Sequence, residues 1–146
     1  MSAKRLVAAV VDASVAIKWL LMEPDSSSAL ALRRRWQGLG VVPAAPDFLL
    51  IELHNVLWRK LQQGHLTPDA PILTYAPTFG LDLNWFPFEP LLPLAWNVAV
   101  RCHVSVYDAL YAALAQQLQV AFYTADLRLA EQLAPVVTVK TLVAHS

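Results

Sequence analysis

Hydrophobic and polar positions divide the chain into short apolar runs separated by longer amphipathic segments. The first run, residues 6–11, is uninterrupted, contains three valines and ends at Asp12. An apolar run of this length that is rich in β-branched residues predicts a strand buried on both faces of a parallel sheet. Parallel strands are joined by crossover helices, which cover both faces of the sheet. The pattern therefore predicts an α/β protein, with a central parallel sheet flanked by helices in three layers.

Caps, breakers and periodicity predict the remaining elements. Ser14 is a good N-cap for a short helix, and the prolines at 43 and 46 bound a short strand. The proline-dense segment 75–93 is the least regular, and Pro77 predicts an end or a kink there. We find no repeat, low-complexity tract or linker, so we expect one domain over residues 1–146. We expect strands at 6–11, 41–42, 82–86, 120–123 and 136–142. We expect helices at 14–21, 47–63, 94–103, 105–119 and 125–133. Two further helices are expected to begin at 25, ending at the glycines at 38 and 40, and at 67.

Four acidic residues occupy similar places, at the end of an apolar strand or in the first turns of an apolar helix. They are Asp12, Glu52, Asp108 and Asp126, in a chain of which only 15% is charged. Carboxylates in apolar surroundings are rarely buried unless they are paired or bind metal. Because the carboxyl ends of parallel strands share one edge of the sheet, we expect these acids to meet at that edge.

Each acid taken singly also has a structural explanation. Asp12 could cap a helix, although Ser14 is the better cap and would leave Asp12 free. Glu52 could belong to a solvent-facing polar stripe of its helix. Asp108 follows Ser105 at capping-box spacing, although the positive end of a helix also favours its ionised form. Together, the four acids indicate a site for a hard divalent cation such as Mg²⁺, which prefers oxygen ligands and relieves repulsion between carboxylates. We interpret this as a metal-dependent site that cleaves phosphodiesters.

Composition narrows the class of protein. Apolar residues make up 57% of the chain, against ~45–50% in typical domains, which indicates a large core or an apolar face covered by a partner. No apolar run near the N-terminus approaches the ~20 residues of a membrane span, and no secretion signal is evident. Cys102 is the single cysteine, so an internal disulfide is excluded. We therefore expect a cytoplasmic protein without a membrane partner.

Charge and motifs exclude several other functions. The 11 basic residues balance the 11 acids. Setting the four candidate ligands aside leaves 7 acids against the 11 basic residues, so the remaining surface would be net positive. Arginines such as Arg59 could then contact phosphates. The four histidines lack the spacing of zinc ligands. There is no nucleophile elbow, no Walker loop and no dinucleotide-binding glycine motif. These absences leave the acids as the main chemical signal.

The acidic segments, in this order, resemble those of the PIN-domain nucleases, specifically the VapC-type toxins of bacterial and archaeal toxin–antitoxin pairs. The resemblance runs from about Val7 to Val143, and the four segments are specific only in combination. The matching segments begin with Val11-Asp12-Ala-Ser14-Val-Ala-Ile-Lys18 and the later Glu23-Pro24, and continue with Leu50-Ile51-Glu52-Leu53, Ser105-Val-Tyr-Asp108-Ala-Leu-Tyr111 and Thr124-Ala-Asp126-Leu-Arg-Leu129.

The resemblance implies a fold, an activity and partners. Members of this family are endoribonucleases that depend on Mg²⁺ or Mn²⁺, and they are usually homodimers. An antitoxin inhibits them by laying its C-terminal segment across the active-site groove. Water would attack the RNA phosphate and leave a 5′-phosphate and a 3′-hydroxyl. By match of position, Asp12, Glu52 and Asp108 would bind metal, Asp126 would bind or support a second metal, and Ser14 and Thr124 would supply neighbouring hydroxyl groups.

Two other classes of protein remain as alternatives. The first is a phosphoacceptor domain. A phosphatase of the haloacid type would need a second Asp at position 14, where Ser stands, and a receiver domain would need adjacent acids before Asp12, where the residues are apolar. A catalytically inert module that keeps the fold and acts as a partner-binding dimer would suit the apolar composition. Such a module gives no reason for four acids, and it would bind no Mn²⁺ through Asp12.

Overall fold

One parallel sheet organises the chain. A computed structural model describes residues 6–74 and 81–142, and in it five strands pair in the order β3-β2-β1-β4-β5, every pair parallel. The α/β class predicted from the apolar runs is thereby confirmed. The strands are β1 (Ala9–Val11), β2 (Ala44–Pro46), β3 (Asn84–Phe86), β4 (Ala121–Thr124) and β5 (Val139–Thr141).

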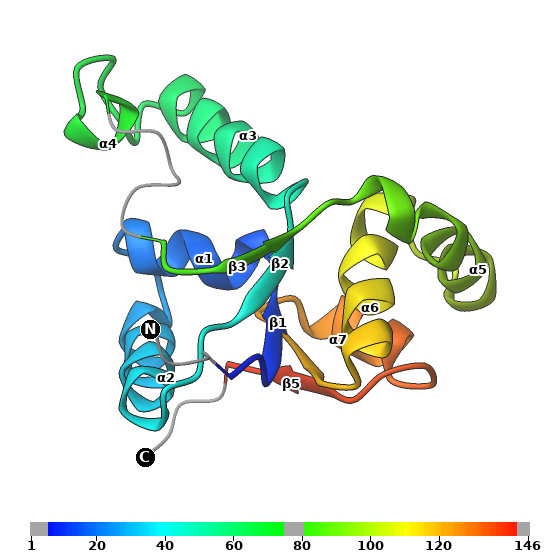
Figure 1. Cartoon of the computed structure of the whole chain (residues 1–146). Helices are drawn as coiled ribbons and strands as arrows, with labels where there is room; N and C mark the ends of the chain where they lie inside the picture. Colours follow the sequence, from blue (N-terminus) through cyan, green and yellow to red (C-terminus); the bar gives the residue numbers. More distant parts are fainter. Residues whose placement is uncertain (1–5, 75–80, 143–146) are drawn as a thin grey trace.

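Helices cover both faces of this sheet, as crossover connections require. The first three helices lie on one side and the last three on the other (Figure 1). Within the described ranges, none of the helices has the length and apolarity that a membrane crossing needs. The helices are α1 (Ala13–Leu20), α2 (Ser26–Leu39), α3 (Leu49–Gln62), α4 (Pro71–Thr74), α5 (Leu92–Cys102), α6 (Val106–Leu118) and α7 (Leu127–Leu133), with a 3₁₀ turn at Glu89–Leu91 before α5.

The order of the strands reverses between β1 and β4. From β1 the chain moves to β2 and β3 on one side, and then returns to the other side of β1 for β4 and β5. Val11 pairs with Tyr123, so β1 and β4 end side by side. Open α/β sheets bind ligands outside the carboxyl ends of the strands at such a reversal. Asp12 follows β1, and Asp126 comes two residues after the end of β4, so this edge of the sheet is where chemistry is expected.

β1, β4 and the buried length of α6 form the part of the core that positions the site. All residues from Ala109 to Ala115 are buried, and the alanines among them let the helix approach the sheet closely. Tyr111 stacks on Phe122 of β4, with ring centroids 5.9 Å apart and planes 17° apart. Because Asp108 lies in the first turn of α6, this packing fixes the position of one predicted site residue.

Some predicted boundaries are wrong. The strand expected at 41–42 lies at Ala44–Pro46, because Pro43 interrupts the run and Val41 makes only an isolated bridge to Leu6. The helix expected from 67 begins at Pro71 and is described as far as Thr74. The predicted end or kink at Pro77 lies outside the described residues.

Leu114→Ala tests the packing of α6. Leu114 is fully buried, so the substitution removes apolar contacts and leaves a cavity. We expect the free energy of unfolding to fall by roughly 2–5 kcal/mol. Gln117→Ala, at an exposed position of the same helix, is the matched control and should change stability by less than about 0.5 kcal/mol. Chemical denaturation of both variants measures the difference, and equal stabilities would show that α6 does not pack as described.

Candidate active site

Asp12 lies directly after β1 and is the N-cap of α1. Its Oδ1 accepts hydrogen bonds from the backbone N–H of Val15 (3.2 Å) and from Ser14 Oγ (2.6 Å). The expectation that Ser14 would cap this helix and leave Asp12 free is therefore wrong. α1 therefore begins at Ala13, one residue earlier than expected, because the Asp12 carboxylate accepts from the amide of Val15 at the third helical position, as N-cap side chains do. The side chain is nevertheless almost fully buried, at 7% exposure.

Two hydroxyl groups hold the Asp12 carboxylate, one from α1 and one from the end of β4. Thr124 Oγ1, at the end of β4, donates to Asp12 Oδ2 at 2.6 Å, while Ser14 donates to Oδ1. The backbone N–H of Ala125 donates to Ser14 Oγ (2.8 Å), and that of Asp126 donates to Thr124 Oγ1 (3.1 Å). Each hydroxyl thus donates a hydrogen bond to Asp12 and accepts one from a backbone N–H group just after β4. The network ties the ends of β1 and β4 together.

Glu52 approaches the same edge from α3. Tyr111, buried in α6, donates its phenolic O–H to Glu52 Oε1. This contact joins the two faces of the sheet, because α3 and α6 cover opposite sides (Figure 1). The sequence stretch around Asp108 included Tyr111, but a role for its hydroxyl was not predicted. The sequence does place Tyr111 three residues after Asp108, and positions three apart lie on one helical face.

Asp108 and Asp126 both lie in the first turn of a helix or just before it. The backbone N–H of Asp108 donates to Ser105 Oγ at 3.1 Å, which is half of the predicted capping box. Asp126 is the N-cap of α7 and accepts from the backbone N–H of Leu129 at 3.1 Å. Asp108 is half-buried and Asp126 is exposed. Both carboxylates therefore remain open to a ligand on at least one side.

Burial and mutual repulsion raise the pKa values of three of these acids. Desolvation raises the pKa of Asp12 to about 6 against the opposing hydrogen bonds of Ser14 and Thr124, and the charge of Asp108 raises it further. The pKa of Glu52 rises to about 7 by burial and by the charges of Asp108 and Asp12, although Tyr111 opposes the rise. Burial and the charge of Asp126 raise the pKa of Asp108. The four predicted acids are thus electrostatically coupled.

The chemistry of these donors fits a hard divalent cation. All are oxygen ligands, and their repulsion is the kind that a cation removes. Among the described residues, however, no three His, Cys, Asp or Glu side chains stand close enough to hold one ion. Three of the acids can therefore share an ion only after side chains move. Mg²⁺ often binds through one or two carboxylates and keeps several waters, so such a cage is not required.

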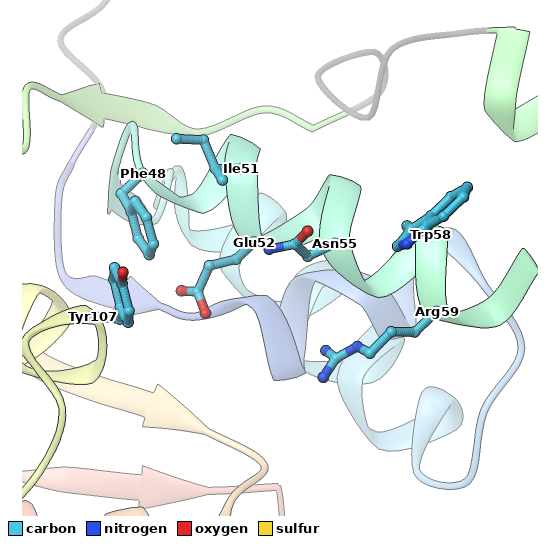
Figure 2. A pocket seen from close by; sticks show the side chains of 7 residues that line it. All are labelled: Phe48, Ile51, Glu52, Asn55, Trp58, Arg59 and Tyr107. Carbon is cyan, nitrogen blue, oxygen red and sulfur yellow. The ribbon is translucent and has the colours of Figure 1, made fainter. Parts of the chain in front are cut away.

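A pocket of about 400 Å³ opens beside Glu52, and we call it the α3 pocket. In Figure 2 the side chains of Phe48 and Tyr107 face each other at one end, next to Glu52, and Trp58 lies at the other end. Of its lining residues, the sequence predicts Glu52 as a metal ligand and Arg59 as a possible phosphate contact. Its lining residues are Phe48, Ile51, Glu52, Asn55, Trp58, Arg59 and Tyr107.

The chain is similar in sequence to known proteins and similar in fold to a solved structure. The sequence model of the family described as PIN domain matches residues 9–132. Ribonuclease VapC3 of Pyrobaculum aerophilum is 30% identical over 131 residues, which cover 88% of this chain and 97% of that protein. Ribonuclease VapC9 of Mycobacterium tuberculosis (strain ATCC 25618 / H37Rv) is 30% identical over 122 residues, covering 84% and 88%. The crystal structure of PAE2754 from Pyrobaculum aerophilum has a TM-score of 0.68 at 20% identity, covering 93% of this chain and 91% of that one.

Fold and site together define a class, an α/β protein with coupled carboxylates at the reversal point of a parallel sheet. This chain belongs to the PIN domain family. The resemblance inferred from the four acidic segments is confirmed at the level of the family. Its similarity to PAE2754 extends to the overall fold.

The pKa shifts predict how stability depends on pH when no divalent cation is present. The pKa values of Asp12 and Glu52 in the folded protein, about 6 and about 7, exceed their ordinary values of 3.8 and 4.5. The folded state therefore binds more protons between about pH 4 and pH 7, and the stabilisation is lost as the pH rises through this window. For Asp12 the loss is on the order of 2–3 kcal/mol.

The test compares native protein with Asp12→Asn in EDTA, by chemical denaturation at several pH values. The variant cannot ionise at this position, so its stability relative to the native protein should rise from pH 4 to pH 7. Asp25→Asn, at an exposed position before α2, is the matched control. A difference between native protein and Asp12→Asn that stays constant over this range would mean that Asp12 is not desolvated.

Proposed function

We propose that this protein is a Mg²⁺- or Mn²⁺-dependent endoribonuclease of the VapC type, which cleaves RNA phosphodiester bonds with water. The observation that carries the proposal is the buried carboxylate of Asp12, held by Ser14 and Thr124 where β1 and β4 end side by side. Membership of the PIN domain family and relatives named as VapC ribonucleases support it. We further propose that residues 1–146 act as one domain and that the protein works in the cytoplasm.

In this proposal, Asp12, Glu52, Asp108 and Asp126 would hold the cation. When bound, it would lower the pKa of the attacking water and offset charge on the leaving 3′ oxygen. Ser14 and Thr124 fix the orientation of the Asp12 carboxylate, and their hydrogen bonds favour its ionised form. Tyr111 does the same for Glu52. The chain's contribution is thus a set of oriented carboxylates that is ready to ionise.

Cleavage of total RNA tests the activity. Native protein with Mg²⁺ or Mn²⁺ should produce new ends that carry a 5′-phosphate, which mapping of 5′ ends detects. Asp12→Asn and Asp108→Asn should each reduce the rate by at least about 100-fold, because each removes a negatively charged oxygen ligand. EDTA should abolish cleavage by the native protein.

Asp82→Asn is the matched control, since Asp82 is an exposed acid that does not line the α3 pocket. It should cleave at the native rate. Cleavage that persists in EDTA would contradict the proposed mechanism. A native protein that cleaves no RNA and binds no Mn²⁺ would instead favour the inert interaction module.

We also propose that the protein forms a homodimer and that an antitoxin chain inhibits it by covering the acidic crevice. An apolar stripe on α5 supports the dimer, because Leu92, Trp96 and Val100 are spaced four residues apart and all are exposed. Positions four apart lie on one helical face, and a second copy could cover the stripe symmetrically. The antitoxin rests on the likeness to VapC proteins.

Trp96→Arg tests the dimer. Trp96 is 62% exposed, so the arginine should not disturb the core of one subunit but would place like charges opposite each other in a symmetric interface. We expect the native protein to have the mass of a dimer by light scattering at tens of micromolar, and the variant that of a monomer. Leu39→Arg, at the exposed end of α2, should remain dimeric. A native monomer at this concentration would refute the dimer.

A further inference from the structure

The α3 pocket contains aromatic surface that the proposed hydrolysis does not use. Tyr107 is 61% exposed, although its ring stacks on Phe48 with centroids 5.1 Å apart and planes 8° apart. Phe48 covers one face of the Tyr107 ring, and most of the side chain remains open to solvent. Trp58, at the other end of the pocket, is 56% exposed. Exposed rings that line a hollow are typical of binding surfaces.

The same pocket contains a cation close to the acids. Arg59 lies on α3 seven residues after Glu52, so both side chains project from the same side of the helix. In Figure 2 both extend into the region beside Asn55. The positive charge of Arg59 opposes, as the smallest of the causes, the rise in the pKa of Glu52, so Arg59 lies within electrostatic reach of that carboxylate. Among the described residues, the ion pairs join Glu23 to Lys18 and Lys60 and do not involve Arg59.

We propose that the α3 pocket holds one nucleotide of single-stranded RNA beside the phosphodiester that is cut. The base stacks on the open face of Tyr107, and Arg59 binds a phosphate of the same strand. This assignment rests on the proposed ribonuclease function. It adds binding sites for a base and a phosphate, which the four acids cannot bind themselves. The four acids repel phosphates, so a neighbouring cation and a stacking surface are what a strand needs to bind there.

The dimensions and chemistry favour an RNA strand over a protein segment. A volume of about 400 Å³ lies within the roughly 300–1,000 Å³ typical of pockets for small ligands, which suits one nucleotide. Aromatic rings interleaved with arginine are the usual means of holding single-stranded nucleic acid. Glu52 forms part of the pocket wall, so whatever fills the pocket is adjacent to the reacting phosphate. A substrate satisfies that requirement directly.

Binding, measured apart from cleavage, tests the subsite. The probe is a fluorescently labelled single-stranded RNA of about 12 nucleotides that spans the main cut found in total RNA, or mixed-sequence RNA if no cut is found. Anisotropy gives its dissociation constant in the full-length Asp12→Asn background with Mg²⁺, where cleavage is blocked. Adding Tyr107→Ala should weaken binding at least about fivefold, as expected for loss of one base–aromatic stack. Adding Tyr107→Phe should leave binding within twofold, because the ring is retained.

Arg59→Ala has a separate signature. Loss of one phosphate contact on a single strand should reduce the slope of log affinity against log salt by about 0.7. The matched controls are Leu39→Ala and Arg34→Ala, which alter exposed residues of α2 outside the pocket and should change neither quantity. Far-ultraviolet circular dichroism and thermal unfolding verify that each variant is folded.

Abasic RNA identifies the contact with the base. One abasic position next to the cut should weaken binding to the Tyr107-containing protein about fivefold and should have no further effect on Tyr107→Ala. The subsite would be overturned if Tyr107→Ala and Arg59→Ala each bound RNA within twofold of the parent. It would also be overturned if these variants changed the oligomeric state without changing the affinity for RNA. Tyr107-dependent binding by a native protein that cuts no RNA would support the subsite and refute the nuclease. Cleavage with no dependence on Tyr107 or Arg59 would do the reverse.

Discussion

Burial of a carboxylate at the end of the central strand is the constraint on which the rest of the site depends. Asp12 is desolvated by the packing of β1, which costs free energy unless the charge is compensated. Ser14 and Thr124 compensate in part. Ser14 is only two residues away in the chain, but Thr124 reaches Asp12 because β1 and β4 end side by side. A fold that separated these two strands would leave the carboxylate without the hydrogen bond from Thr124.

Repulsion among the acids explains why hydrogen bonds alone do not complete the site. The charges of Asp108 and Asp12 both raise the pKa of Glu52, and that of Asp126 raises the pKa of Asp108. Each acid makes ionisation of its neighbour more costly, although every one of them comes from a different element. A bound divalent cation would favour ionisation of all these acids, because the ionised carboxylates would share its positive charge. Arg59 adds a positive charge at the edge of the cluster, which fits a role in binding the substrate.

The sequence was sufficient to predict the sheet, most helices and the neighbourhood of the four acids, because these follow from apolar runs and parallel connections. Residues 6–11 and 120–123 gave the two strands that matter most. The role of Asp12 as a cap was missed, because cap choice between Asp12 and Ser14 depends on hydroxyl bonds to a residue 110 positions away. The contact from Tyr111 to Glu52 and the α3 pocket were missed for the same reason. Both depend on how α3 and α6 pack, which periodicity does not specify.

We propose that these carboxylates are gathered for a divalent cation. Titration of the native protein with Mn²⁺ at pH 7.5, with free Mn²⁺ followed by electron paramagnetic resonance, tests this alongside Asp12→Asn. We expect the native protein to remove Mn²⁺ from solution, its affinity to fall as the pH is lowered toward 5, and Asp12→Asn to bind at least about tenfold more weakly. Equal binding by the native protein and the variant, or no binding by either, would contradict it.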